Sequence, residues 1–121
     1  MERNRKILVI DDSETNVFLL QKILEEEGCD IEYAYTGKDA IQLLDTRTYD
    51  LVLLDIMMSG IDGFDILQKM KDDNKTEKCP IIMVTANDDI ETQQKAIRMG
   101  AKDYLTKPLN LKKLKNIIDS I

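Results

Sequence analysis

The chain of 121 residues contains no histidine, no tryptophan and only two cysteines. Without histidine, neither a His-based catalytic triad nor a His general base can form. Cys29 and Cys79 form no Cys-x-x-Cys pair, so a zinc site lacks ligands, and reduced thiols in a cytoplasmic protein are the simplest interpretation. The longest apolar runs, which include residues 7–10 and 51–54, are strand-sized and far shorter than the roughly 20 residues that a membrane span requires.

Positive charges are outnumbered, because the chain has 17 Lys and Arg residues and 23 Asp and Glu residues, which gives a net charge of −6. Duplex nucleic acid and anionic membrane surfaces bind basic faces, so neither is expected as a direct partner of this chain. A content of 43% apolar and 33% charged residues is typical of a globular protein. The length predicts a single domain over residues 1–121, with no output domain in this chain.

Apolar runs alternate regularly with stretches of helical periodicity. The predicted strands cover residues 6–10, 30–35, 50–54, 80–85 and 102–105. The predicted helices cover residues 14–27, 36–45, 63–72, 90–99 and 111–121. Strict alternation predicts βαβ units, and therefore an α/β domain with a parallel five-stranded sheet covered by helices on both faces. The first, third and fourth strands are almost entirely apolar, so we expect them at the centre of the sheet.

Polar residues gather where the predicted strands end. Asp11 and Asp12 follow the first strand, Asp55 follows the third, Thr85 ends the fourth and Lys107 follows the fifth. Ligands of open α/β sheets bind at the carboxyl ends of the strands, so these residues are expected on one rim. Taken singly, each has an ordinary explanation as a turn acid, a strand residue or a surface lysine. Their common position favours a functional site.

The residue types on this rim suit phosphoryl chemistry. Three neighbouring carboxylates repel one another unless a hard divalent cation such as Mg²⁺ neutralises them. The compact charge of Lys107 suits a phosphate group. A carboxylate surrounded by a metal, a lysine and a hydroxyl can attack a phosphoryl group and form an aspartyl phosphate, which requires no histidine base.

Four segments together resemble the response-regulator receiver domains of two-component signalling, which include the chemotaxis receivers. The segments are ILVIDD at 7–12, LLDIMM at 53–58 with Asp62-Gly63 after it, VTA at 84–86 and GAKDYLTKP at 100–108. Their order and spacing match over essentially the whole chain. The resemblance implies a doubly wound (βα)5 flavodoxin-like domain with strand order 2-1-3-4-5.

The resemblance also implies a role for each residue of the rim. Asp55 would accept a phosphoryl group from a histidine kinase or a histidine phosphotransfer protein. Asp11, Asp12, Asp55 and the backbone carbonyl of Met57 would hold Mg²⁺ or Mn²⁺. Such a domain catalyses only its own phosphorylation and slow autodephosphorylation, so it is not expected to be an enzyme acting on other substrates.

A second group of implied residues belongs to a conformational switch. Thr85 and Lys107 would contact the phosphoryl group, Tyr104 would change position when Thr85 is drawn to the phosphate, and the Lys107–Pro108 peptide would be cis. The face formed by the fourth helix, the fifth strand and the fifth helix would control a downstream effector protein or a missing output domain, with a phosphorylation-dependent dimer as one route. The sequence departs from the family at Ser59, where the family usually has proline.

The fourth predicted helix has a thin apolar stripe, formed by Ile90, Ala96 and Ile97. It is either an edge helix with little core contact or a helix that moves and presents the output surface. Of these, the resemblance favours the moving helix.

Two other classes of protein compete with this interpretation. A Mg²⁺-dependent phosphohydrolase would also use an aspartate nucleophile, but haloacid-dehalogenase-like enzymes carry it after strand one in an Asp-x-Asp pattern, whereas here Asp11 and Asp12 are adjacent. A flavodoxin-like flavin carrier would cradle phosphate in its first loop. Asp11 and Asp12 would repel that phosphate, and no tryptophan is available to stack on the flavin.

Overall fold

The computed structural model describes residues 4–86 and 89–121, which form five strands and five helices in alternation. The strands are β1 (Lys6–Ile10), β2 (Asp30–Ala34), β3 (Leu51–Asp55), β4 (Ile81–Thr85) and β5 (Asp103–Thr106). The helices are α1 (Glu14–Glu26), α2 (Gly37–Thr46), α3 (Gly63–Asp72), α4 (Ile90–Arg98) and α5 (Leu111–Asp119). All neighbouring strands are parallel, and their order is β2-β1-β3-β4-β5, as the resemblance implies. The predicted α/β class is therefore confirmed.

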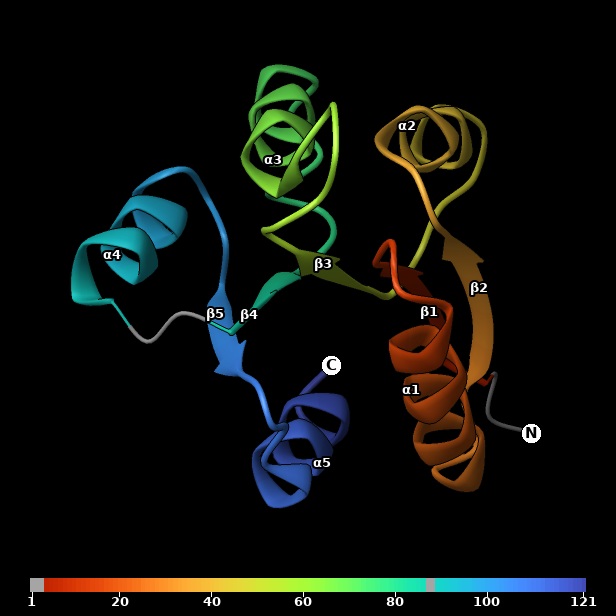
Figure 1. Ribbon diagram of the computed structural model, residues 1–121. Helices are drawn as coiled ribbons and strands as arrows, with labels where there is room; N and C mark the ends of the chain where they lie inside the picture. Colours follow the sequence, from red (N-terminus) through yellow and green to blue (C-terminus); the bar gives the residue numbers. More distant parts are fainter. Residues whose placement is uncertain (1–3, 87–88) are drawn as a thin grey trace.

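The sheet separates two apolar layers. Helices α1 and α5 cover one face, and α2, α3 and α4 cover the other (Figure 1). Alternate residues of a strand point to opposite faces, so Ile7 and Val9 pack in the layer under α1 and α5, whereas Leu8 and Ile10 pack in the other. Every residue of β3 and β4 is buried, which confirms that these apolar strands are central.

The ends of several elements differ from the predicted ends by one or two residues. Asp55, predicted to follow the third strand, is its last residue, because Asp55 pairs with Val84 in the ladder and the next amide, of Ile56, donates to the Val84 carbonyl at 3.2 Å. Strand β5 likewise begins and ends one residue later than predicted, since Thr85 pairs with Thr106. Ladder pairing, which no single segment encodes, decides these limits.

Capping side chains define where the helices begin. Ser13 and Thr36 accept hydrogen bonds from the backbone amides of Asn16 and Asp39, at 3.3 and 3.1 Å. The full reciprocal capping box is at α3, where Asp62 and Asp65 each accept from the backbone of the other. Among the described residues, no helix has the length and apolarity to cross a membrane.

Helix α4 is attached to the domain through few side chains. Its buried residues are Gln93 and Ala96. Ile90 and Ile97, two of the three residues in its thin apolar stripe, are 66% and 43% exposed, which agrees with a helix that makes little contact with the core. Gln93 and Ala96, three residues apart, form the side of the helix that faces the core, whereas Ile90 and Ile97, seven residues apart, share a neighbouring side that faces solvent.

Candidate functional site

Three carboxylates meet at the carboxyl ends of β1 and β3. Asp11 and Asp12 directly follow β1, Asp55 ends β3, and these strands are neighbours in the sheet. One carboxylate oxygen from each lies within 4.8 Å of the others. Asp11 and Asp55 are only 2% and 4% exposed, whereas Asp12 faces solvent. The structure thus brings together the three acids that the sequence predicted on this rim.

Asp11 is fixed by three donors. Its Oδ1 accepts from the backbone amide of Ser13 at 2.9 Å, and its Oδ2 accepts from Asn16 Nδ2 at 3.4 Å and from Lys107 Nζ at 3.3 Å. The sequence analysis missed Asn16, which lies in the first turn of α1, five residues after Asp11. Because its own oxygens are held, the Asp11 side chain has a defined orientation toward Asp55.

Lys107 is the counter-charge of the cluster. Its Nζ lies 3.6 Å from Asp55 Oδ1 and 3.3 Å from Asp11 Oδ2, so one ammonium bridges the two buried carboxylates. The backbone amide of Lys107 donates to the Thr85 carbonyl at 2.8 Å, which anchors the lysine to the end of β4. The following Lys107–Pro108 peptide bond is cis.

The environment of Asp55 opposes its ionisation. Burial, and next the negative charge of Asp11, raise the pKa of Asp55 from 3.8 to about 6. The charge of Lys107 and the Met57 amide, which donates to Asp55 Oδ1 at 3.3 Å, act in the opposite direction, while Asp12 raises the pKa further. A single lysine therefore leaves the negative charge of this site only partly compensated.

The cluster fits a hard divalent cation. Mg²⁺ prefers oxygen ligands, one or two carboxylates and retained water, and here two buried carboxylates and a third exposed to solvent converge within reach of one ion. The raised pKa of Asp55 supports the same conclusion, because an added positive charge would relieve the burial and repulsion that raise it. Soft or borderline metals should bind weakly here, because neither cysteine nor histidine contributes a ligand to this cluster.

Gly63 allows the segment after Asp55 to fold back on the strand. A Cβ at this position would lie 2.4 Å from the Asp55 carbonyl oxygen, which is much shorter than a van der Waals contact between carbon and oxygen. The Gly63 amide donates to the Ile56 carbonyl at 3.1 Å and closes the turn. The sequence marked Asp62-Gly63 as part of a motif, but the tight contact that excludes a side chain is visible only in the structure.

Thr85 borders the open side of the site. It is 1% exposed and, with Asp12, Met57 and Ser59, lines a hollow of about 580 Å³. This hollow is the approach to the carboxylates from the side of the β3–α3 loop. The side chain of Met57, 71% exposed, stands at its edge.

Tyr104 lies in β5 near α4. It is half-buried and lines a shallow hollow of about 370 Å³ together with residues of α4 that include Gln93 and Ile97. Tyr104 pairs with Met83, two residues before Thr85 in the neighbouring strand. Paired residues of parallel strands point to the same face, so Tyr104 and Thr85 occupy the same face of the sheet on adjacent strands.

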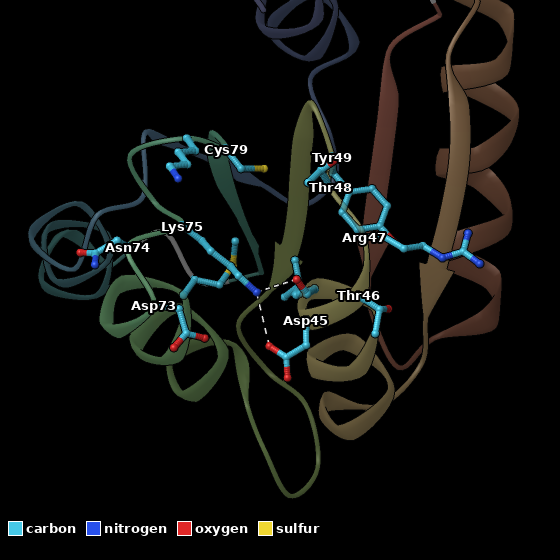
Figure 2. Close-up of a pocket in the computed structure, with 12 residues that line it drawn as sticks. Asp45, Thr46, Arg47, Thr48, Tyr49, Asp73, Asn74, Lys75 and Cys79 are labelled. Carbon is cyan, nitrogen blue, oxygen red and sulfur yellow. Dashed lines mark hydrogen bonds and ion pairs between the residues drawn. The ribbon is translucent and has the colours of Figure 1, made fainter.

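A further hollow of about 500 Å³ lies at the opposite end of the sheet, between the segment that precedes β3 and the one that precedes β4 (Figure 2). Lys75 spans it and donates to the Leu44 carbonyl at 2.6 Å and to Asp45 at 3.3 Å. Burial raises the pKa of the neighbouring Cys79 thiol to about 11, so this cysteine is protonated at neutral pH. These side chains are engaged in holding the fold, and the acidic cluster remains the candidate site.

The doubly wound parallel sheet, with a lysine-bridged acidic cluster at its carboxyl edge, defines an α/β domain of the flavodoxin-like class. The family model "Response regulator receiver domain" matches residues 7–119. The chain belongs to this family, and its role is accordingly that of a receiver domain in phosphorylation-dependent two-component signalling.

Individual relatives agree with this assignment. The response regulator PleD of Caulobacter vibrioides is 39% identical over 105 residues, which are 87% of this chain and 23% of that protein. The receiver domain of the Francisella response regulator 1452 has a TM-score of 0.90 at 32% identity, covering 97% of this chain and 95% of that one. A two-component response regulator from Clostridium difficile has a TM-score of 0.89 at 35% identity, covering 97% and 94%.

Proposed function

We propose that this chain is a phosphorylation-activated switch in which Asp55 accepts a phosphoryl group from the phosphohistidine of a kinase or phosphotransfer protein. The observation that carries the proposal is the bridge from Lys107 to the buried Asp11 and Asp55. A carboxylate oxygen of Asp55 forms the new bond to phosphorus, the phosphorus–nitrogen bond of the donor breaks, and its electrons return to the imidazole. The chain has no histidine, so the donor must be another protein or domain.

Asp11, Asp12, Asp55 and the Met57 carbonyl are the ligands that would hold Mg²⁺ or Mn²⁺. When bound, the cation would neutralise charge on the transferring phosphoryl oxygens, which is the main requirement of such transfers. The fixed orientation of Asp11 prepares one ligand in advance, because Ser13 and Asn16 already hold it. Asp12, exposed to solvent, is free to rotate toward the ion.

Lys107 and Thr85 complete the acceptor site. Lys107 pairs with Asp55 before transfer, and afterwards its ammonium can bind an oxygen of the phosphoryl group that Asp55 carries. Thr85 lies on the strand next to β3, and its hydroxyl is the group that we expect to turn toward the phosphoryl oxygen. These two residues therefore bind and orient the group, and neither needs to act as a base.

The switch connects this site with the face of α4, β5 and α5. Thr85 and Tyr104 share one face of the sheet on neighbouring strands, so a movement of Thr85 toward the phosphate opens space into which the Tyr104 ring can turn. Helix α4 buries only the side chains of Gln93 and Ala96 among its described residues, so it can shift when the Tyr104 ring turns. The exposed Ile90 and Ile97 then offer an apolar contact to a downstream effector or output domain.

The donor has a suitable docking surface beside the site. A hollow of about 360 Å³ between α1 and the β5–α5 loop includes Asp11 and Lys107 in its lining, and its other walls are mainly apolar. Leu19, 54% exposed, belongs to this lining and offers an apolar contact on α1. A helix of the donor that covers it would place a phosphohistidine at the entrance of the acidic site.

Incubation with acetyl phosphate and Mg²⁺, followed by intact mass measurement, tests the assignment. Wild type is expected to gain one phosphoryl group and Asp55→Asn none. Equal labelling of the two proteins would overturn the role of Asp55. The same preparation, assayed on a panel of phosphomonoesters, tests the alternative of a Mg²⁺-dependent phosphohydrolase. Such an enzyme would hydrolyse many substrate molecules per protein molecule, whereas a switch would gain one phosphoryl group at Asp55.

A further inference from the structure

The ammonium of Lys113 makes three contacts with β5. Lys113 lies in the first turn of α5, and its Nζ donates to the Tyr104 carbonyl at 2.7 Å. The same atom lies 3.5 Å from Asp103 Oδ1 and 4.6 Å from the centre of the Tyr104 ring. One side chain of α5 thus contacts the backbone, the neighbouring carboxylate and the aromatic face at a single position of the strand.

These contacts differ in how they depend on the tyrosine side chain. The bond to the carbonyl and the pair with Asp103 involve groups that stay in place when the Tyr104 ring rotates. They hold the ammonium where it is. The cation–π contact, in contrast, exists only while the ring faces Lys113, and it is lost when the ring turns away.

In the position described, the ring of Tyr104 lines the shallow hollow beside α4 and is partly open to solvent. The switch requires the ring to leave this hollow and turn toward the space beside Thr85. Lys113 lies on α5, so its contact with the ring favours the outward position over the inward one.

We propose that Lys113 is a positioning residue that clamps the Tyr104 ring in its outward position and thereby sets the threshold of the switch. This inference rests on the proposed function, because it assumes that the ring moves when Asp55 is modified. A cation–π contact at a partly exposed site corresponds to a factor of about two to five in an equilibrium constant. Loss of the clamp should make the active conformation easier to reach by the same factor.

The chain provides a matched control on the same helix. Lys115 is exposed, and within the part of the chain that the structure describes its side chain makes no hydrogen bond, ion pair or ring contact. Lys113→Met keeps the aliphatic stem and removes the charge, Lys115→Met makes the same change without the contacts, and Lys113→Arg restores a cation. The four tyrosines allow 3-fluorotyrosine labelling, with the Tyr104 resonance assigned by Tyr104→Phe.

The experiment is a titration of the Mg²⁺-loaded proteins with beryllium fluoride, which mimics the phosphoryl group, followed by fluorine NMR. Lys113→Met should bind about two- to fivefold more tightly than wild type and shift the Tyr104 resonance toward its saturated position before any ligand is added. Lys115→Met should match wild type, and Lys113→Arg should lie near it.

A double-mutant cycle separates the clamp from a merely structural role. In a Tyr104→Leu background, Lys113→Met should no longer change the affinity, since no ring remains to be clamped. An unchanged affinity and resonance in Lys113→Met alone, or an equal effect with and without the ring, would overturn the inference. Failure of wild type to bind beryllium fluoride, or equal binding by Asp55→Asn, would instead refute the proposed function.

Discussion

Lys107 Nζ lies 3.3 Å from Asp11 Oδ2, although the two residues are 96 positions apart in the chain. They belong to the ends of β5 and β1, and two strands, β3 and β4, lie between these in the sheet. The lysine therefore reaches across the ends of both central strands and passes Asp55 on the way. This one side chain joins the metal-ligand candidate Asp11, the acceptor candidate Asp55 and the β5 segment that contains Tyr104.

Replacement of Asp55 by Asn should stabilise the fold in the absence of divalent cation. The raised pKa means that the folded chain holds the Asp55 proton more tightly than the unfolded chain does. Its stabilising contribution is complete below the ordinary value of 3.8 and is lost as the pH rises through about 6. We expect Asp55→Asn to gain about 1–3 kcal/mol in free energy of unfolding at pH 8 and almost none at pH 4.

Urea unfolding at several pH values measures this difference. Asp12→Asn is the control, because Asp12 is exposed and its removal should bring a smaller gain. Mg²⁺ should stabilise wild type and narrow its difference from Asp55→Asn. A gain that does not vary between pH 4 and pH 8 would contradict the assigned cause.

The Lys107→Ala variant should fold normally and still accept a phosphoryl group at Asp55, but the Tyr104 ring should no longer change position. The substitution removes the ammonium that bridges Asp11 and Asp55 at 3.3 and 3.6 Å, but leaves the backbone bond to Thr85 in place. We expect acetyl phosphate to label the variant more slowly, with no accompanying shift of the Tyr104 resonance. Lys102→Ala, an exposed lysine one residue before β5, should behave as wild type. A full Tyr104 response in labelled Lys107→Ala would show that the lysine is no part of the relay.

Gly63→Ala should damage the site as well as the fold. The added Cβ would meet the Asp55 carbonyl at 2.4 Å, and forced rearrangement of such a packed contact costs about 1–3 kcal/mol. Gly28→Ala is a useful comparison, because Gly28 has a φ of +81° but open space around it and lies far from Asp55. Both variants should lose stability by urea unfolding, whereas only Gly63→Ala should be labelled more slowly at Asp55. Normal labelling of Gly63→Ala would count against its role in placing the acceptor.

Leu19→Ser should slow phosphoryl transfer from a protein donor without affecting acetyl phosphate. Leu19 is 54% exposed on α1 beside the site, so it can contact a docked protein but not a small phosphodonor. Ile97→Ser removes a comparable exposed side chain from α4, away from the donor surface, and should leave donor transfer unchanged. Transfer rates from a phosphorylated histidine kinase domain or phosphotransfer protein provide the measurement. Equal slowing by both variants would place the donor elsewhere.

Most of the fold could be predicted because its signals are local. Apolar strands alternate with helices that begin at capping residues, and this alternation is typical of an α/β fold with a parallel sheet. The candidate site was predictable for a related reason: residues at strand ends share an edge whenever the strands are parallel. The sequence left the role of α4 open, because only packing decides that Gln93 is buried while Ile90 and Ile97 are exposed.

The sequence alone determined which residues could take part in phosphoryl chemistry, because the acids, Thr85 and Lys107 follow or end their strands and no histidine is present to do the same work. It also implied the strand order, through the resemblance to receiver domains. Only the tertiary structure decided the charge balance, since burial and the distances among Asp11, Asp55 and Lys107 depend on three separate strands. The contact of Lys113 with Tyr104 is of the same kind: it arises where α5 packs beside β5, and no spacing within either segment specifies it.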